Sequence, residues 1–138
     1  MQLTRAADYA VRVMMHMAAL PPGSRTSRSA LAVAASCPEQ FLSKVLQDLT
    51  RAGLVVSHRG NTGGFELPAL SVGVSVLDVV EAVEGPIHLN ICLACDAVCE
   101  RQSWCPAHPV WARAQQAMVA VLGATFIADL AKQSPPWN

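Results

Sequence analysis

Apolar residues in about the first fifty positions recur at the three- and four-residue steps of amphipathic helices. The pattern predicts one helix from Thr4 to Leu20 and a short second helix with Ser27 as its N-cap. A third helix is expected to open with a capping box at Ser36-Cys37-Pro38-Glu39 and to end at Ala52-Gly53. Its inner face is predicted to consist of Phe41, Leu42, Val45, Leu46 and Leu49.

The pattern changes after Gly53. Residues 54–57 and 65–67 are expected to form strands, and Arg59–Gly64 between them is a glycine-rich hairpin tip. Three helices followed by a hairpin predict a winged helix-turn-helix, in which a tight turn joins the second helix to the third.

Beyond Pro68 we expect a helix over 75–83, an irregular stretch over 87–104, and a long helix from Cys105 or Pro106 with a continuous apolar stripe. A last short helix is expected over 125–132. The fold class is therefore mainly α with a small β-hairpin wing: a winged helix-turn-helix domain plus a long C-terminal dimerisation helix. We predict a DNA-binding domain over 1–85, a cysteine-rich loop over 86–105, dimerisation helices over 106–133 and an irregular tail over 134–138.

The amino-acid composition indicates that the protein also has a partner chain. Hydrophobic residues make up 52% of the 138 residues and charged residues 14%, which indicates a surface partly covered by a second copy of the chain. Pro, Gly or Ser breaks the longest uncharged apolar stretch well short of the roughly 18 residues that a membrane span needs. The N-terminal run contains Asp8 and Arg12, unlike a secretory signal. We therefore expect a cytoplasmic homodimer with no membrane contact.

The net charge is zero, but the charges are unevenly distributed. Residues 1–65 carry seven basic and three acidic side chains, a balance of +4, and the rest of the chain carries −4. A basic half joined to an acidic half indicates a DNA-facing module and a regulatory one, although chance also produces such a division of twenty charges.

The second helix of a helix-turn-helix pair lies in the major groove, where its early exposed residues reach the bases. On the third predicted helix that face carries side chains able to bind bases or phosphates, and its alternative role is that of an ordinary solvated surface. The hairpin tip favours DNA, because an arginine on a narrow loop fits the negative potential of a minor groove. The tip lacks the Lys-Ser/Thr ending of a nucleotide-binding loop. The predicted DNA-binding residues are Arg28, Gln40, Ser43, Lys44, Gln47, His58, Arg59 and Gly60.

Four of the five cysteines lie close together, at positions 92, 95, 99 and 105. In a reducing compartment such a group binds metal more often than it forms disulfides. Thiolates ligate iron–sulfur clusters and zinc alike. Only Cys92 and Cys95 form a C-x₂-C knuckle, whereas structural zinc sites usually pair two. Spacing alone leaves open a cluster, a zinc ion, or redox-active thiols without a ligand.

The sequence resembles the Rrf-two (Rrf2) family of bacterial winged-helix transcriptional regulators, whose members include the iron–sulfur cluster regulator IscR, NsrR and RirA. The likeness spans nearly the whole chain. The segments that carry it are Met1–Thr4, Asp8–Arg12, Phe41–Leu46, Ala52–Val55, Ser57–Gly60, Gly63–Phe65, Asp78–Gly85 and the clustered cysteines.

The resemblance implies an iron–sulfur cluster, [2Fe–2S] or [4Fe–4S], with Cys92, Cys99 and Cys105 as ligands. The fourth ligand implied by different members is His108, three residues after the last cysteine, or Asp8 of the other subunit. The chain departs from the family in an additional cysteine, Cys95, in one more residue between Cys92 and Cys99, and in Asn61-Thr62 at the wing. Cys95 is therefore a further candidate for the fourth ligand.

Together these observations predict a homodimeric DNA-binding transcriptional regulator, a repressor, whose binding to a double-stranded operator is controlled by the cluster as it senses cluster or iron status, nitric oxide or redox stress. The cluster loop is expected to pack between the dimer helix and the winged domains. No nucleophile–base arrangement indicates an enzyme. The alternative is a winged-helix regulator whose loop holds zinc or senses thiol oxidation.

Overall fold

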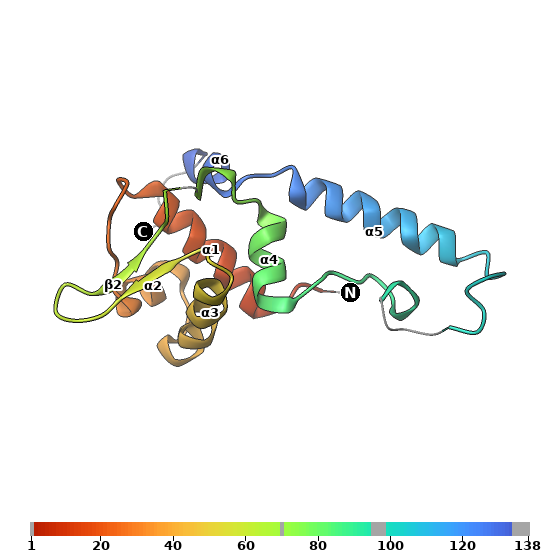
Figure 1. The fold of residues 1–138 in the computed structure, drawn as a ribbon, viewed down its shortest axis with the longest axis horizontal. Helices are drawn as coiled ribbons and strands as arrows, with labels where there is room; N and C mark the ends of the chain where they lie inside the picture. Colours follow the sequence, from red (N-terminus) through yellow and green to blue (C-terminus); the bar gives the residue numbers. More distant parts are fainter. Residues whose placement is uncertain (1, 70, 95–98, 134–138) are drawn as a thin grey trace.

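The computed structural model describes residues 2–69, 71–94 and 99–133. Its helices and strands form a winged-helix unit at one end of an elongated molecule, and a long helix, α5, projects from that unit (Figure 1). The elements are α1 (Arg5–Ala19), α2 (Arg28–Ala35), α3 (Glu39–Arg51), β1 (Val56–His58), β2 (Gly64–Glu66), the 3₁₀ turn η1 (Ser71–Gly73), α4 (Val76–Glu84), the 3₁₀ turn η2 (Ile91–Leu93), α5 (His108–Gly123) and α6 (Ile127–Lys132).

Helix α1 is the centre of the winged-helix unit. The side chain of Thr4 caps it by accepting a hydrogen bond of 3.2 Å from the Ala7 backbone N–H. Its buried face packs against α2, α3, α4 and α6. The core around it is almost entirely aliphatic, and its largest fully buried side chains are Met14, Leu31, Leu42, Leu46, Leu49, Ile127, Val13, Val45, Val55, Val79 and Val80.

The connection between α2 and α3 differs from the prediction. Ser36 adopts a left-handed conformation, with φ of 53°, and ends α2 as its C-cap. The N-cap of α3 is Pro38, which makes no side-chain capping bond, so the predicted capping box at Ser36–Glu39 is wrong. Phe41 was also assigned wrongly to the inner face: it is 44% exposed and its ring meets the ring of Tyr9 edge-on, with 5.5 Å between centroids.

The wing is a two-stranded antiparallel hairpin, as predicted. Its register pairs Val56 with Glu66, Ser57 with Phe65 and His58 with Gly64. The first strand begins two residues and the second one residue from the predicted starts, within the usual uncertainty of strand ends. The mainly helical winged-helix fold is thus confirmed.

Helix α4 carries a capping box that the sequence analysis missed. The Ser75 hydroxyl accepts a bond of 3.1 Å from the Asp78 N–H, and the Asp78 carboxylate accepts one of 2.9 Å from the Ser75 N–H. Gly85, with φ of 78°, ends the helix as predicted. Within the described ranges, no helix is long and apolar enough to cross a membrane.

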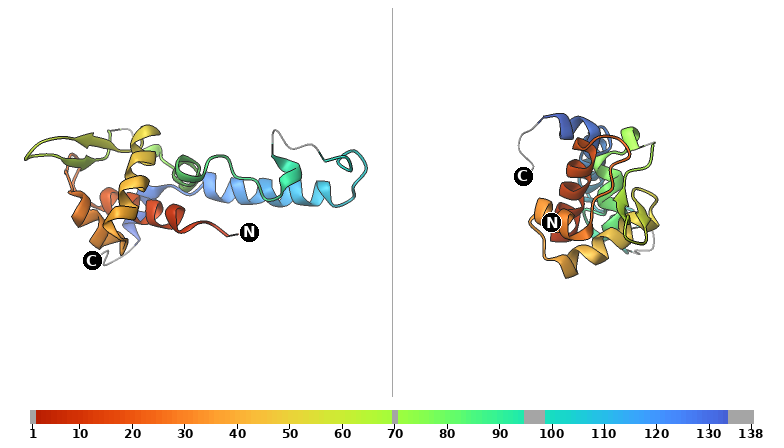
Figure 2. Two further views of the ribbon diagram at one scale, coloured as in Figure 1. Left: turned by 90° about the horizontal axis from the view of Figure 1, so that it is seen from below. Right: turned by 90° about the vertical axis from the view of Figure 1, so that its left-hand side faces the viewer.

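Helix α5 begins at His108, slightly later than the sequence indicated, and none of its residues is fully buried. Only its C-terminal half meets the winged-helix unit, where Met118 and Leu122 pack against a small cluster formed by Ala7, Val80 and Ile87. Its N-terminal half projects away, and the cysteine-containing segment lies around that outer end (Figures 1 and 2). Ile87, at the start of the predicted loop, packs between α5 and the winged-helix unit, and the expected packing of the cysteines in the dimer stays a prediction.

Candidate nucleic-acid interface and cysteine loop

The outward face of α3 presents the polar residues that were predicted to read DNA. Gln40, Lys44 and Gln47 are exposed. Ser43 is half-buried, and its hydroxyl donates to the Glu39 carbonyl oxygen at 3.3 Å and accepts from the Arg28 guanidinium at 3.2 Å. This face is hydrophilic while the opposite one is packed in the core, so the helix offers a free polar surface to a ligand.

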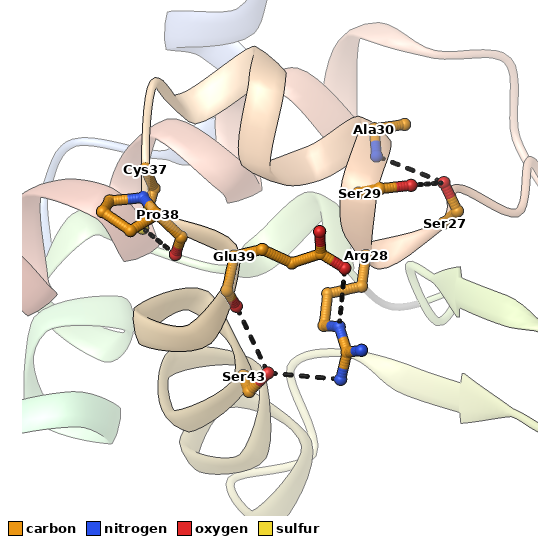
Figure 3. A network of polar contacts seen from close by, with 8 residues as sticks. All are labelled: Ser27, Arg28, Ser29, Ala30, Cys37, Pro38, Glu39 and Ser43. Carbon is orange, nitrogen blue, oxygen red and sulfur yellow. Dashed lines mark hydrogen bonds and ion pairs between the residues drawn. The ribbon is translucent and has the colours of Figure 1, made fainter.

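Arg28 connects the two helices of the helix-turn-helix. It is the first residue of α2, and its Nε donates to the Glu39 carboxylate at 3.3 Å while its Nη1 reaches Ser43 (Figure 3). Both Arg28 and Glu39 are about half exposed, so this ion pair is solvated and weak. The guanidinium is therefore available to exchange its carboxylate for a phosphate.

Asp48 was not singled out by the sequence analysis. Its Oδ1 accepts hydrogen bonds from Lys44 Nζ at 2.8 Å and from Arg51 Nη1 at 3.2 Å. Asp48 itself is buried, whereas the two cations are exposed. The signal was present in the sequence as opposite charges at i, i+4 and i, i+3 spacing along one helix.

A cleft of about 410 Å³ lies between α3 and the base of the wing. It has an arginine from α2 and another from the end of α3, with hydroxyl and amide groups between them, and none of the described residues that line it carries a carboxylate. Both arginines are ion-paired, Arg28 with Glu39 and Arg51 with Asp48, and a DNA strand running between helix and wing would bring its phosphates close to them. The lining residues are Arg28, Ser43, Leu46, Gln47, Thr50, Arg51, Ser57 and Phe65.

At the wing tip, Arg59 and Gly60 are exposed, and no ion pair of the described residues involves Arg59. His58 is held lower on the hairpin, where its Nε2 lies 2.6 Å from the Glu66 carboxylate. Arg25, outside the predicted set, donates to the Thr62 carbonyl oxygen at 3.0 Å and so supports the tip. Arg59 thus gives the wing tip a positive charge that no ion pair of the described residues neutralises.

The cysteine loop has local order near α5. Cys92 lies in η2, and Cys99 and Cys105 are half-buried like it. Successive backbone bonds shape the chain after Cys99: Gln102 N–H to the Cys99 carbonyl at 3.1 Å, and Cys105 N–H to the Arg101 carbonyl at 2.8 Å. Among the residues that the structure describes, no group of three or more His, Cys, Asp or Glu side chains is close enough to hold a metal ion. The three predicted ligands are therefore not brought together, and Cys95 lies outside the described residues.

The other two candidates for the fourth ligand are placed differently. His108 is the first residue of α5, and its N–H donates to the Cys105 carbonyl at 3.2 Å, so the two residues share one turn. Its Nδ1 is buried without a hydrogen-bond partner. Asp8 lies on α1, where its carboxylate pairs with Arg12 at 2.7 Å. Thiols together with an imidazole fit an iron–sulfur cluster or zinc chemically.

Comparison with known proteins gives the family. Residues 3–133 match the sequence profile of Rrf2, described as an iron-dependent transcriptional regulator. The chain belongs to the Rrf2 family of transcriptional regulators. Among its relatives, protein aau3 of Rhizobium meliloti is 36% identical over all of this chain and 90% of its own. Rv1287 of Mycobacterium tuberculosis, named as an HTH-type transcriptional regulator, is 32% identical over 99% of this chain and 84% of its own.

Solved structures of Rrf2-type fold superpose over nearly the whole chain. CymR (YrzC), the global cysteine regulator of B. subtilis, gives a TM-score of 0.77 at 25% identity and covers 98% of this chain and 99% of its own. IscR of T. potens gives 0.75 at 23% identity, over 99% and 93% respectively. With 98% of this chain covered, the similarity to CymR extends beyond the winged-helix unit.

Proposed function

We propose that this Rrf2 regulator binds a roughly palindromic DNA operator as a homodimer, acts as a repressor, and has its DNA affinity set by the state of the cysteine loop. The observation that carries the proposal is the polar face of α3 beside a wing whose exposed tip carries Arg59, with Arg25 bonded to that tip from the segment before α2. We assign DNA contacts to Arg28, Gln40, Ser43, Lys44, Gln47, His58, Arg59 and Gly60. Of these, His58 acts from the side of the hairpin, where Glu66 holds it.

The homodimer is supported by the surface of α5. Val110, Trp111 and Val121 are 54%, 41% and 66% exposed, and the 16-residue helix has no fully buried side chain, so packing within one chain supports it weakly. A second α5 related by a two-fold axis would cover this face, and two recognition helices would then meet successive major grooves about one turn apart.

For the loop we propose an iron–sulfur cluster held by Cys92, Cys99 and Cys105, with His108, Asp8 of the second subunit or Cys95 as fourth ligand. When bound, the cluster supplies a centre whose oxidation state and integrity respond to oxygen, nitric oxide and iron supply. The protein residues convert the state of the cluster into a conformational change. Cys105 and His108 share the turn that opens α5, so a change of ligation there reorients the start of the dimer helix and shifts the population of DNA-binding conformations.

A second candidate is a regulator that senses through zinc or bare thiols. Two observations bear on it: the described side chains do not converge on a metal position, which favours bare thiols over any metal, and CymR, a cysteine regulator by name, shares the fold over 98% of this chain. Anaerobic purification separates the two. Visible absorbance with matched iron and sulfide supports the cluster. Protein that stays colourless and iron-free after anaerobic reconstitution excludes it.

Variants sharpen that measurement. Cys105→Ser is expected to abolish iron and sulfide incorporation, while Cys37→Ser, far from the loop in sequence and buried at the start of α3, leaves both unchanged. DNA binding is tested separately by selecting a duplex from a random-sequence pool with the purified protein. No enrichment over the starting pool would refute the regulator function.

A further inference from the structure

Asp48 is a charged residue in a position that charged residues rarely occupy. It is 7% exposed, on the face of α3 that also buries Val45 and Leu49. A carboxylate this buried is costly unless it is paired. Asp48 is paired twice, because one of its oxygens accepts from both Lys44 and Arg51.

The two cations lie on either side of Asp48 along the helix. The side chains of Lys44 and Arg51 are 67% and 72% exposed, so they reach solvent while their charged ends remain tied to the carboxylate. Lys44 belongs to the proposed reading face, and Arg51 lines the cleft between α3 and the wing. Lys44, Asp48 and Arg51 form a trio with a net charge of +1, whereas the two cations without Asp48 would carry +2.

This arrangement affects the two modes of DNA binding differently. Non-specific binding comes almost wholly from cations that neutralise phosphates and release counterions, so a nearby carboxylate weakens it. At an operator, base contacts and the wing fix the helix, and cations already held in place lose less side-chain freedom on binding. A carboxylate among the cations thus weakens binding to non-specific DNA more than it weakens binding to the operator.

We propose that Asp48 is a specificity-determining residue of the recognition helix, which acts through Lys44 and Arg51 to suppress non-specific DNA binding. The inference rests on the DNA binding proposed above. The Arg28–Glu39 pair is less suited to this role, since both side chains are about half exposed and their contact is longer, at 3.3 Å.

The experiment compares two duplexes of equal composition: one selected from a random pool with the wild-type chain, and a scrambled version of it. Fluorescence anisotropy over a range of salt concentrations gives the affinity for each duplex and the slope of log K against log salt. Asp48→Asn keeps the shape of the side chain and removes its charge. We expect tighter binding to the scrambled duplex, a salt slope steeper by about one counterion, and an operator-to-scrambled ratio lower by about threefold or more.

Asp129→Asn on α6 is the matched control. It also removes one negative charge from an ion pair, the 3.7 Å contact with Lys132, but lies outside the DNA-reading face. We expect the control to leave the ratio unchanged. If Asp48→Asn and Asp129→Asn give the same ratio as the wild type, the inference is overturned while the regulator function stands. If the wild type itself does not distinguish the two duplexes, the proposed function fails first.

Thermal unfolding of Asp48→Asn must show that the protein is folded at the assay temperature, because the residue is buried. If it is not folded, Arg51→Gln tests the same trio from its exposed end. A salt slope shallower by about one for both duplexes supports the placement of the trio at the DNA. An unchanged slope overturns it.

Discussion

Thr26 and Phe65 exchange two backbone hydrogen bonds of 2.9 Å each, although one precedes α2 and the other is the middle residue of β2. The segment before α2 is thus attached to the wing by one antiparallel bridge. Since Ser27, the next residue, caps α2, the hairpin and the helix-turn-helix are joined through the main chain. The wing is therefore held in position by backbone bonds, which most side-chain changes leave intact.

Gly64 is the position where this junction is most sensitive. Its φ is +135°, and a Cβ there would lie 2.9 Å from the Thr26 carbonyl oxygen. We expect Gly64→Ala to destabilise the fold by about 1–3 kcal/mol through backbone strain and to weaken DNA binding. Thermal unfolding measures the first effect and anisotropy the second. Gly73→Ala, which meets open space, is the control, and equal melting temperatures for the two variants would contradict the prediction.

Arg59 is predicted to contribute one phosphate or minor-groove contact from the wing tip. Arg59→Gln should weaken binding to operator and scrambled duplexes alike, with a salt slope shallower by about 0.9. Arg113→Gln removes an exposed arginine from α5 and should change neither affinity nor slope. An Arg59 variant that behaves like the Arg113 variant would show that the wing tip does not touch DNA.

The exposed face of α5 is predicted to be a dimer contact. Val121→Glu places a charge on it, at a residue that is 66% exposed in the single chain. We expect a shift from dimer to monomer in light scattering coupled to size-exclusion chromatography, because an unpaired charge would be desolvated at the interface. Val72→Glu, at a site 72% exposed on η1, should remain dimeric. A dimeric Val121 variant would refute pairing through α5.

Cysteine reactivity should divide the thiols into two classes. Burial raises the pKa of the Cys37 thiol, and the charge of Arg12 lowers it by less. At neutral pH Cys37 is therefore protonated, and the thiolate is the form that reacts with iodoacetamide. Mass spectrometry after brief labelling of metal-free protein should find Cys92, Cys99 and Cys105 modified before Cys37. Labelling of Cys37 first would contradict this assignment.

Much of the fold follows from local sequence signals. Ser27 caps the helix that it was predicted to cap, Gly85 ends α4, and α1 begins one residue after the predicted start, with Thr4 as its N-cap. The errors lie where tertiary contacts decide. Serine is a common N-cap residue, but Ser36 adopts a left-handed conformation and is the C-cap of α2. Phe41 is apolar, yet it packs at the surface on Tyr9.

The candidate site was predictable only in part. The outward residues of α3 follow from helical periodicity alone, whereas Asp48 required the recognition that a buried carboxylate holds Lys44 and Arg51. The assembly of the cysteine ligands does not follow from spacing, because residues near in sequence still need a fold that turns their side chains toward one point. His108 is an example. Its turn with Cys105 is a local feature, but the burial of its Nδ1 depends on how the chain folds around it.

The placement of the cysteine segment at the outer end of α5 has an evolutionary consequence. Within the described residues, none between 88 and 117 belongs to either buried cluster of the winged-helix unit. Insertions, deletions and exchanges of ligands in that stretch therefore leave the packing of the DNA-reading unit untouched. A lineage with this architecture can acquire a new signal by altering one short piece of chain, while a new target sequence requires changes in α3, whose inner face is fixed by the core.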